Sequence, residues 1–161
     1  MKTHTLDFAL VLSLVVATPA WARLGESEAD VIARYGKCLY KMHRPWGDVE
    51  GYSMNSFTIT VTLIQGVSRG ELFVITPGQT ITDEQEVDLL GANSEGYSWS
   101  DAPPEDIPKH AYPPVKQMWV RPNGSTAVLT ASSIEFKSIF LIEAQQDAAN
   151  QKPAAPSTQG F

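Results

Sequence analysis

The sequence predicts an α+β fold, in which an antiparallel sheet carries short helices on one face. Two segments, beginning at Ser27 and Thr82, place helix-capping residues before amphipathic runs. Residues 57–63 alternate apolar side chains with threonines, a pattern typical of a half-buried strand. Further short apolar runs are separated by Gly, Pro and Asn residues that favour turns. The order helix, three strands, helix, three or four strands is consistent with one helix-plus-three-strand unit used twice.

The first helix is predicted to follow Ser27, a favoured N-cap residue, with Asp30 at the capping-box position three residues later. Gly36 supplies the left-handed position that commonly ends a helix. The apolar stripe that we expect to cover the sheet comprises Val31, Ile32 and Tyr35. The stretch therefore predicts a short structural helix without chemistry of its own.

The second helix is predicted to follow Thr82, with Gln85 at the capping-box position. Val87 and Leu90 are expected to face the sheet. The expected strands are 49–54, 57–63, 72–76, 117–121, 126–131 and 137–143, with another beginning near 97–99. Residues 66–70 are expected to form a turn, and the proline-rich segment 102–114 an extended loop.

The last predicted strand, 137–143, has a competing interpretation. A helix from Ile134 also fits, because Phe136, Ile139 and Phe140 follow helical spacing. From Ala144 onwards the composition changes to Ala, Gln, Asn and Pro, which predicts a disordered tail over 144–161. One domain is therefore expected over residues 23–143.

Residues 1–22 have the features of a secretion signal. Lys2 precedes the apolar run 8–16, and the Ala20-Trp21-Ala22 segment fits a cleavage site. The run is too short to span the ~30 Å hydrocarbon core of a bilayer. We therefore expect an exported protein, periplasmic or extracellular, with no membrane span after cleavage.

Charge and motifs exclude several functions. The net charge is −6, without a basic cluster, which disfavours nucleic acid and anionic lipid as partners. The sequence lacks a G-x-S-x-G turn and a glycine-rich phosphate loop. His43, His110 and Cys38 lack the close spacing that zinc sites usually show. We therefore predict no metal, no cofactor and no enzymatic activity.

The predicted function is contact with a partner protein, which the sequence does not identify. Trp46 and Tyr112 lie in proline-bearing segments, 41–48 and 102–116, and are candidates for the contact surface together with His43 and His110. Such aromatic residues also serve to pin loops or fill a core. Two alternatives remain open: a thiol-dependent activity or covalent dimer through Cys38, and a module that binds a small ligand.

The N-terminal stretch also carries a resemblance. Residues 24–26 (Leu-Gly-Glu), followed after a short amphipathic helix by 34–37 (Arg-Tyr-Gly-Lys), resemble the start of a family of small uncharacterised bacterial exported proteins. Residues 89–93 resemble a helix end of that family. Cys38 stands where that family usually has proline, so the following turn is less constrained. The resemblance implies no catalytic residues, because the family has no assigned activity.

The order of the elements is similar in outline to two kinds of exported binding protein. These are the outer-membrane assembly lipoproteins of the SmpA/OmlA kind and the secreted β-lactamase inhibitor proteins. The likeness concerns the fold alone, and a fold does not determine function.

Overall fold

The structure is a computed structural model of the 161-residue chain, and it describes residues 23–151. The predicted signal peptide therefore lies outside the described residues, as do residues 152–161 of the predicted tail. In chain order the elements are α1 (Glu28–Tyr35), β1 (Tyr40–Arg44), β2 (Gly47–Met54), β3 (Phe57–Ile64), β4 (Val67–Ile75), α2 (Asp83–Ala92), β5 (Ser100–Asp101), β6 (Gln117–Val120), β7 (Thr126–Leu129), β8 (Ser133–Lys137) and α3 (Ile139–Asn150).

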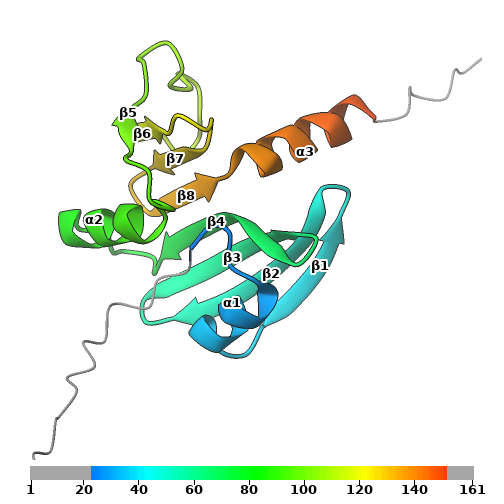
Figure 1. The fold of residues 1–161 in the computed structure, drawn as a ribbon. Helices are drawn as coiled ribbons and strands as arrows, with labels where there is room; N and C mark the ends of the chain where they lie inside the picture. The colour runs from blue at the N-terminus through cyan, green and yellow to red at the C-terminus, as the bar shows by residue number, and fades with distance from the viewer. Residues whose placement is uncertain (1–22, 152–161) are drawn as a thin grey trace, which may run out of the picture.

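The strands form one antiparallel sheet of eight strands in the order β1-β2-β3-β4-β8-β7-β6-β5, which confirms the α+β prediction. Each of α1 and α2 is followed by four consecutive strands, and the two four-stranded halves meet where β4 pairs with β8 (Figure 1). The predicted repeating unit thus has four strands rather than three. The additional strand in the first half is β1, which falls in a region expected to be a loop.

One face of the sheet, here called the inner face, is covered by α1 and α2. The alternation predicted for 57–63 is confirmed, since every second residue of β3 is buried on this face. Register places Tyr52, Ile59, Phe73 and Ile134 side by side across four strands. The rings of Phe57, Phe73 and Phe136 meet edge to face at 6.1 Å, the favoured geometry for aromatic pairs.

Both predicted capping boxes are present, at Ser27 with Asp30 and at Thr82 with Gln85. Of the stripe in α1, Val31 and Tyr35 are buried, and the Tyr35 ring lies 5.5 Å from that of Tyr52. Two predicted core positions are wrong, because the side chain of Ile32 in α1 is 44% exposed and that of Val87 in α2 is 67% exposed. In α2, Leu89 is the buried residue instead.

The opposite side, here called the outer face, carries α3, so the helices do not all lie on one face. Leu141 of α3 packs directly over Gly70 of β4, where an added Cβ would lie 2.3 Å from a Leu141 methyl carbon. The chain leaves β8 and runs as α3 towards the tip of the β1–β2 hairpin (Figure 1). This helix covers the outer face only near its first turn.

Three expectations about chain segments are corrected. The predicted last strand, 137–143, is wrong, because the strand is Ser133–Lys137 and a helix begins at Ile139. The competing helix was expected from Ile134, which lies in the strand. The tail was predicted to begin at Ala144, but residues 144–150 belong to α3, which ends at Asn150. The turn predicted over 66–70 is confined to Gln65 and Gly66, so Ser68 and Gly70 are buried within β4.

Candidate functional site

Trp46 lies at the tip of the β1–β2 hairpin. Arg44 pairs with Gly47, so Pro45 and Trp46 form the two-residue connection. Gly47 has a φ of +145°, and a Cβ there would lie 2.3 Å from the carbonyl oxygen of Leu63. Only glycine fits this approach to the end of β3. The backbone therefore holds the half-buried Trp46 in a defined place at the edge of the sheet.

The second wall of the site is α3, which is anchored at its N-terminal end. Ser138 is the N-cap, and its side chain accepts a hydrogen bond from the backbone N–H of Leu141. The backbone N–H of Ser138 also donates to the carbonyl of Arg69 in β4 at 2.8 Å. Beyond Leu141, the described residues show no hydrogen bond or ion pair from 144–151 to the sheet. The C-terminal half of α3 therefore stands away from the strands.

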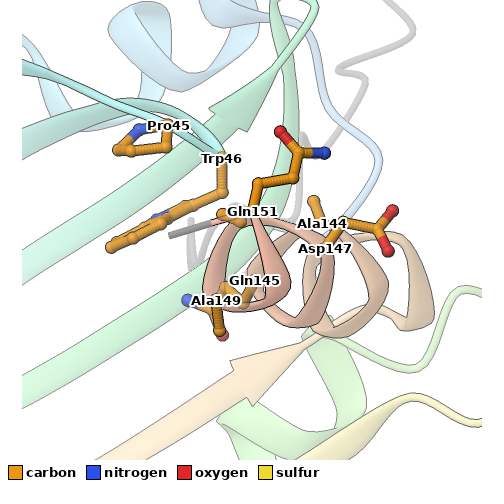
Figure 2. Close-up of a pocket in the computed structure, with 8 residues that line it drawn as sticks. Pro45, Trp46, Ala144, Gln145, Asp147, Ala149 and Gln151 are labelled. Carbon is orange, nitrogen blue, oxygen red and sulfur yellow. The ribbon is translucent and has the colours of Figure 1, made fainter. Parts of the chain in front are cut away.

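Between these walls lies an open cleft of about 720 Å³, here called the Trp46 cleft. Figure 2 shows the Trp46 indole alongside the C-terminal half of α3. A volume of this size is typical of ligand sites in proteins. The lining residues are Pro45, Trp46, Ala144, Gln145, Asp147, Ala148, Ala149 and Gln151.

The cleft extends along α3 towards the middle of the outer face. Gln145 also lines a second hollow of about 80 Å³, whose walls include Thr60, Thr62 and Leu141. The threonines belong to the polar side of the β3 alternation, opposite the core. Gln145 is the residue that the two hollows share, and the second hollow is also lined by Glu135 and Lys137.

The described lining of the Trp46 cleft is mainly apolar groups and side-chain amides. It combines one aromatic ring, one proline ring, alanine methyl groups and two side-chain amides. Within residues 23–151, Asp147 is the one charged residue of this lining, which contains no histidine, cysteine, serine or lysine. Amides donate and accept hydrogen bonds without changing charge. The arrangement can hold a neutral ligand, with apolar contact to Trp46 and hydrogen bonds to Gln145 and Gln151.

The structure does not gather the predicted contact residues at one place. Trp46 lines the cleft at the β1 edge of the sheet, whereas His110 and Tyr112 lie in the loop between β5 and β6 at the opposite edge. Seven strand spacings separate these edges, a distance of roughly 30 Å. The Tyr112 side chain is 97% exposed. Trp46 and Tyr112 therefore cannot belong to one small contact surface.

His43 is also separated from the cleft, although it is close to Trp46 in sequence. It lies in β1 rather than in a turn, and it pairs with Asp48 on the inner face of the sheet. Its Nδ1 lies 2.9 Å from the Asp48 carboxylate, and this hydrogen bond holds the pKa of Asp48 below its usual value. His43 is thus part of a charged cluster on the side away from the cleft.

Cys38 lies just before β1 and is half-buried against the edge of the core. Its thiol donates a hydrogen bond to the carbonyl of Tyr40 at 2.9 Å. The Cys38 side chain is therefore not fully buried. Its position does not bring it to either histidine that was considered as a partner for metal binding.

The charged cluster at the β1 edge is centred on Lys41. Its ammonium nitrogen lies 2.8 Å from Glu50, 2.9 Å from Glu28 and 3.6 Å from Asp48. The hydrogen bonds to Glu50 and Glu28 raise the pKa of Lys41 well above its usual value. Since Glu28 belongs to α1 and the other carboxylates to β2, the cluster ties the helix to the edge of the sheet.

Glu50 is the buried member of this cluster. Burial alone would raise the pKa of Glu50, but its hydrogen bonds with Lys41 and with the Tyr52 hydroxyl outweigh burial and lower it. The same burial and hydrogen bond raise the pKa of Tyr52. These groups satisfy one another, so we assign the cluster to structure rather than to acid–base chemistry.

Glu71 is a second buried carboxyl on the inner face. Ser68 donates a hydrogen bond to one oxygen at 3.1 Å, and the other oxygen has no partner among the described residues. Burial raises the pKa of Glu71 to about 8, which the Ser68 hydrogen bond partly opposes. The N-terminal segment packs alongside, with the backbone N–H of Gly25 donating to the Ser68 carbonyl at 2.8 Å. Glu71 is therefore largely protonated at neutral pH and sealed from solvent.

Sequence reasoning missed the α3 wall of the cleft. Gln145, Asp147 and Gln151 were placed in a tail, although Ser138 is a good N-cap and the Ala and Gln residues that follow favour helix. Treating Ser138 as an N-cap would have predicted a helix from Ile139. Its position opposite Trp46 depends on packing between distant parts of the chain.

Comparison of the chain with protein-family models, with curated proteins and with solved structures finds no match. The family resemblance of the N-terminal stretch therefore stays a prediction. Among residues 23–151, no helix is long and apolar enough to cross a bilayer. The same part of the chain shows no group of three or more His, Cys, Asp or Glu side chains placed to hold a metal ion.

Proposed function

We propose that this protein is an exported, non-enzymatic binding domain whose Trp46 cleft receives an extended, proline-bearing peptide segment of a partner protein. The observation that carries the proposal is the open 720 Å³ cleft between the Trp46 indole and the C-terminal half of α3. Export rests on the predicted signal over residues 1–22. The proposal places partner contact at Trp46, which lies in 41–48, one of the two segments that the sequence suggested for such contact.

The lining favours a peptide in the polyproline II conformation. Such a peptide makes no internal hydrogen bonds, so its carbonyl groups need donors from the protein or water. Gln145 and Gln151 present amide donors on one wall, and Trp46 presents a flat apolar ring on the other. Docking of proline side chains on aromatic rings is a recurrent mode of peptide recognition.

The shape and charge of the site agree with this ligand. A second, smaller hollow lined by Thr60 and Thr62 shares Gln145 with the Trp46 cleft, and an extended chain could reach both hollows more readily than a compact molecule. Among residues 23–151, no positively charged side chain lines the Trp46 cleft itself, and Lys137 lines the second hollow, so an acidic segment or a phosphate group would gain little beside Trp46.

The test uses a ten-residue polyproline peptide, added to the protein while the indole N–H signals of the tryptophans are followed by NMR. We expect the Trp46 signal to shift on binding and the signals of Trp99 and Trp119 to stay in place. Trp46→Ala should weaken binding by at least about tenfold, as expected for a central aromatic anchor. Tyr112→Ala is the matched control, because it removes an exposed aromatic ring at the other edge of the sheet.

Two results would contradict the proposal. If Tyr112→Ala weakens binding and Trp46→Ala does not, the contact surface is the proline-rich loop. If maltohexaose shifts the Trp46 signal and the peptide leaves it unchanged, the cleft binds a glycan instead of a protein segment.

A further inference from the structure

The described chain ends at the wall of the Trp46 cleft. Gln151 is the C-cap of α3 and also lines the cleft. Ten residues follow it, with the sequence Lys-Pro-Ala-Ala-Pro-Ser-Thr-Gln-Gly-Phe. Pro153 cannot continue the hydrogen bonding of α3 and disfavours helical backbone at the residue before it.

The length of this segment matches the length of the cleft. The α3 wall runs from residue 144 to 151, a rise of roughly 10 Å at about 1.5 Å per residue. Residues 153–156 span roughly 9 Å in polyproline II at about 3.1 Å per residue. A reversal at Lys152 would thus place 153–156 along the whole wall, antiparallel to α3.

The chemistry of the segment also matches the lining. Residues 153–156 read Pro-Ala-Ala-Pro, and the three-residue turn of polyproline II brings Pro153 and Pro156 to the same edge of the peptide. That edge presents two proline rings to the Trp46 indole. The small alanines between them suit a wall made largely of Ala144, Ala148 and Ala149.

We infer that residues 152–161 bind in the Trp46 cleft of their own molecule, with Pro153 and Pro156 against the Trp46 ring, and so compete with external ligands. The inference rests on the proposed function of the same cleft. Tethering gives the segment an effective concentration of about 1 mM. A segment that binds with a Kd of about 0.1 mM would therefore lower the apparent affinity of an external peptide about tenfold.

The experiment compares the full chain with the double variant Pro153→Asp/Pro156→Asp, which leaves every described residue unchanged. We expect the indole N–H signal of Trp46 to differ between the two proteins, while those of Trp99 and Trp119 coincide. Adding the synthetic peptide 152–161 to the variant should return the Trp46 signal towards its wild-type position. The same peptide with Asp in place of both prolines is the control and should have no effect.

Binding of the polyproline peptide to both proteins then tests whether residues 152–161 occupy the cleft separately from whether the cleft binds peptides. We expect it to bind the double variant about ten times more tightly than the wild type. Equal binding to both proteins, with identical Trp46 signals, would overturn the inference and leave the proposed function standing. Failure to bind either protein, combined with identical Trp46 signals, would overturn both. A Trp46 difference that disappears on dilution would place the segment in the cleft of a second copy and overturn binding within one molecule.

Discussion

The two faces of the β1–β4 half differ in how their helices are attached. On the inner face, α1 is held at both ends. At its N-terminal end the backbone N–H of Gly25 donates to the Ser68 carbonyl of β4, and at its C-terminal end the buried Tyr35 ring packs against Tyr52 of β2. On the outer face, α3 is held near Ser138 and Leu141 and then leaves the sheet. The inner face is closed to solvent and buries the carboxyl groups of Glu50 and Glu71, whereas the outer face has the open Trp46 cleft. A helix anchored at one end is a simple way to keep a binding surface beside a rigid sheet.

The largest effect that this comparison predicts is on the inner face of β4. Phe73→Ala removes a fully buried ring that contacts Phe57 and Phe136. We expect the free energy of unfolding to fall by about 3–5 kcal/mol, measured by urea denaturation. Val74→Ala is the matched control, since the neighbouring side chain points to the outer face and is 37% exposed. It should cost below about 1 kcal/mol, and an equal cost at both positions would contradict the asymmetry of the faces.

The second effect concerns the anchor of α3. Leu141→Ala removes the buried side chain that packs over Gly70 and should destabilise the protein by about 2–3 kcal/mol. Because α3 is attached mainly there, we expect hydrogen exchange to accelerate within 139–150 before it does so in β3 and β4. Glu143→Ala, at an exposed position of α3, is the control. Uniform acceleration over sheet and helix would mean that α3 belongs to the same cooperative unit as the core.

The third effect is a pH dependence on the sealed face. The pKa of Glu71 is raised to about 8 from 4.5, so the folded protein retains a proton that the unfolded chain loses. Stability should therefore fall as the pH rises from about 4.5 to about 8 and be level above that range. Glu71→Gln keeps the shape without the titration and should flatten this part of the curve, as measured by urea denaturation at a series of pH values. A wild-type curve that is already flat between pH 5 and pH 8 would show that Glu71 titrates normally.

The elements that the sequence predicted well are those determined by neighbouring residues. The cap at Ser27, the end of α1 at Gly36 and the alternation in β3 all depend on residues within a few positions of one another. β1 was missed because it is an edge strand with every residue exposed, so its sequence lacks an apolar alternation. The start of α3 was misassigned because residues 139–142 are apolar throughout, which fits a buried strand as well as a helix.

The candidate site was predictable only in part. Trp46 was identified because an aromatic residue beside a proline in a connection is a frequent contact residue. Its partner wall was not, because Gln145 and Trp46 come from opposite ends of the domain and meet only through the pairing of β4 with β8. Tyr112 has the same local signals as Trp46, yet it lies at the other edge of the sheet. Sequence signals therefore found individual residues, and the sheet order decided which of them share a site.

The smallest expected effect is at the β1 edge, where ion pairs of Lys41, rather than apolar packing, cover the inner face. Lys41→Met leaves Glu50 buried without its cation, while the exposed Glu28 and Asp48 are stabilised by water. Since the Lys41 side chain is 45% exposed, we expect a loss of about 1 kcal/mol at pH 7. Lys109→Met, in the exposed loop, is the control and should have no effect.

The direction of the pH dependence distinguishes this cluster from Glu71. The pKa of Glu50 is lowered in the folded protein, so its contribution is present above its unfolded value of 4.5 and is lost as the pH falls through the lower folded value. The wild type should therefore lose stability on the acid side, and Lys41→Met should lose less there, because Glu50 no longer has a cation to release. Urea denaturation between pH 3 and pH 7 measures both curves. An unchanged acid-side slope in Lys41→Met would show that packing around Tyr52, and not the Lys41 ion pairs, holds β1 against α1.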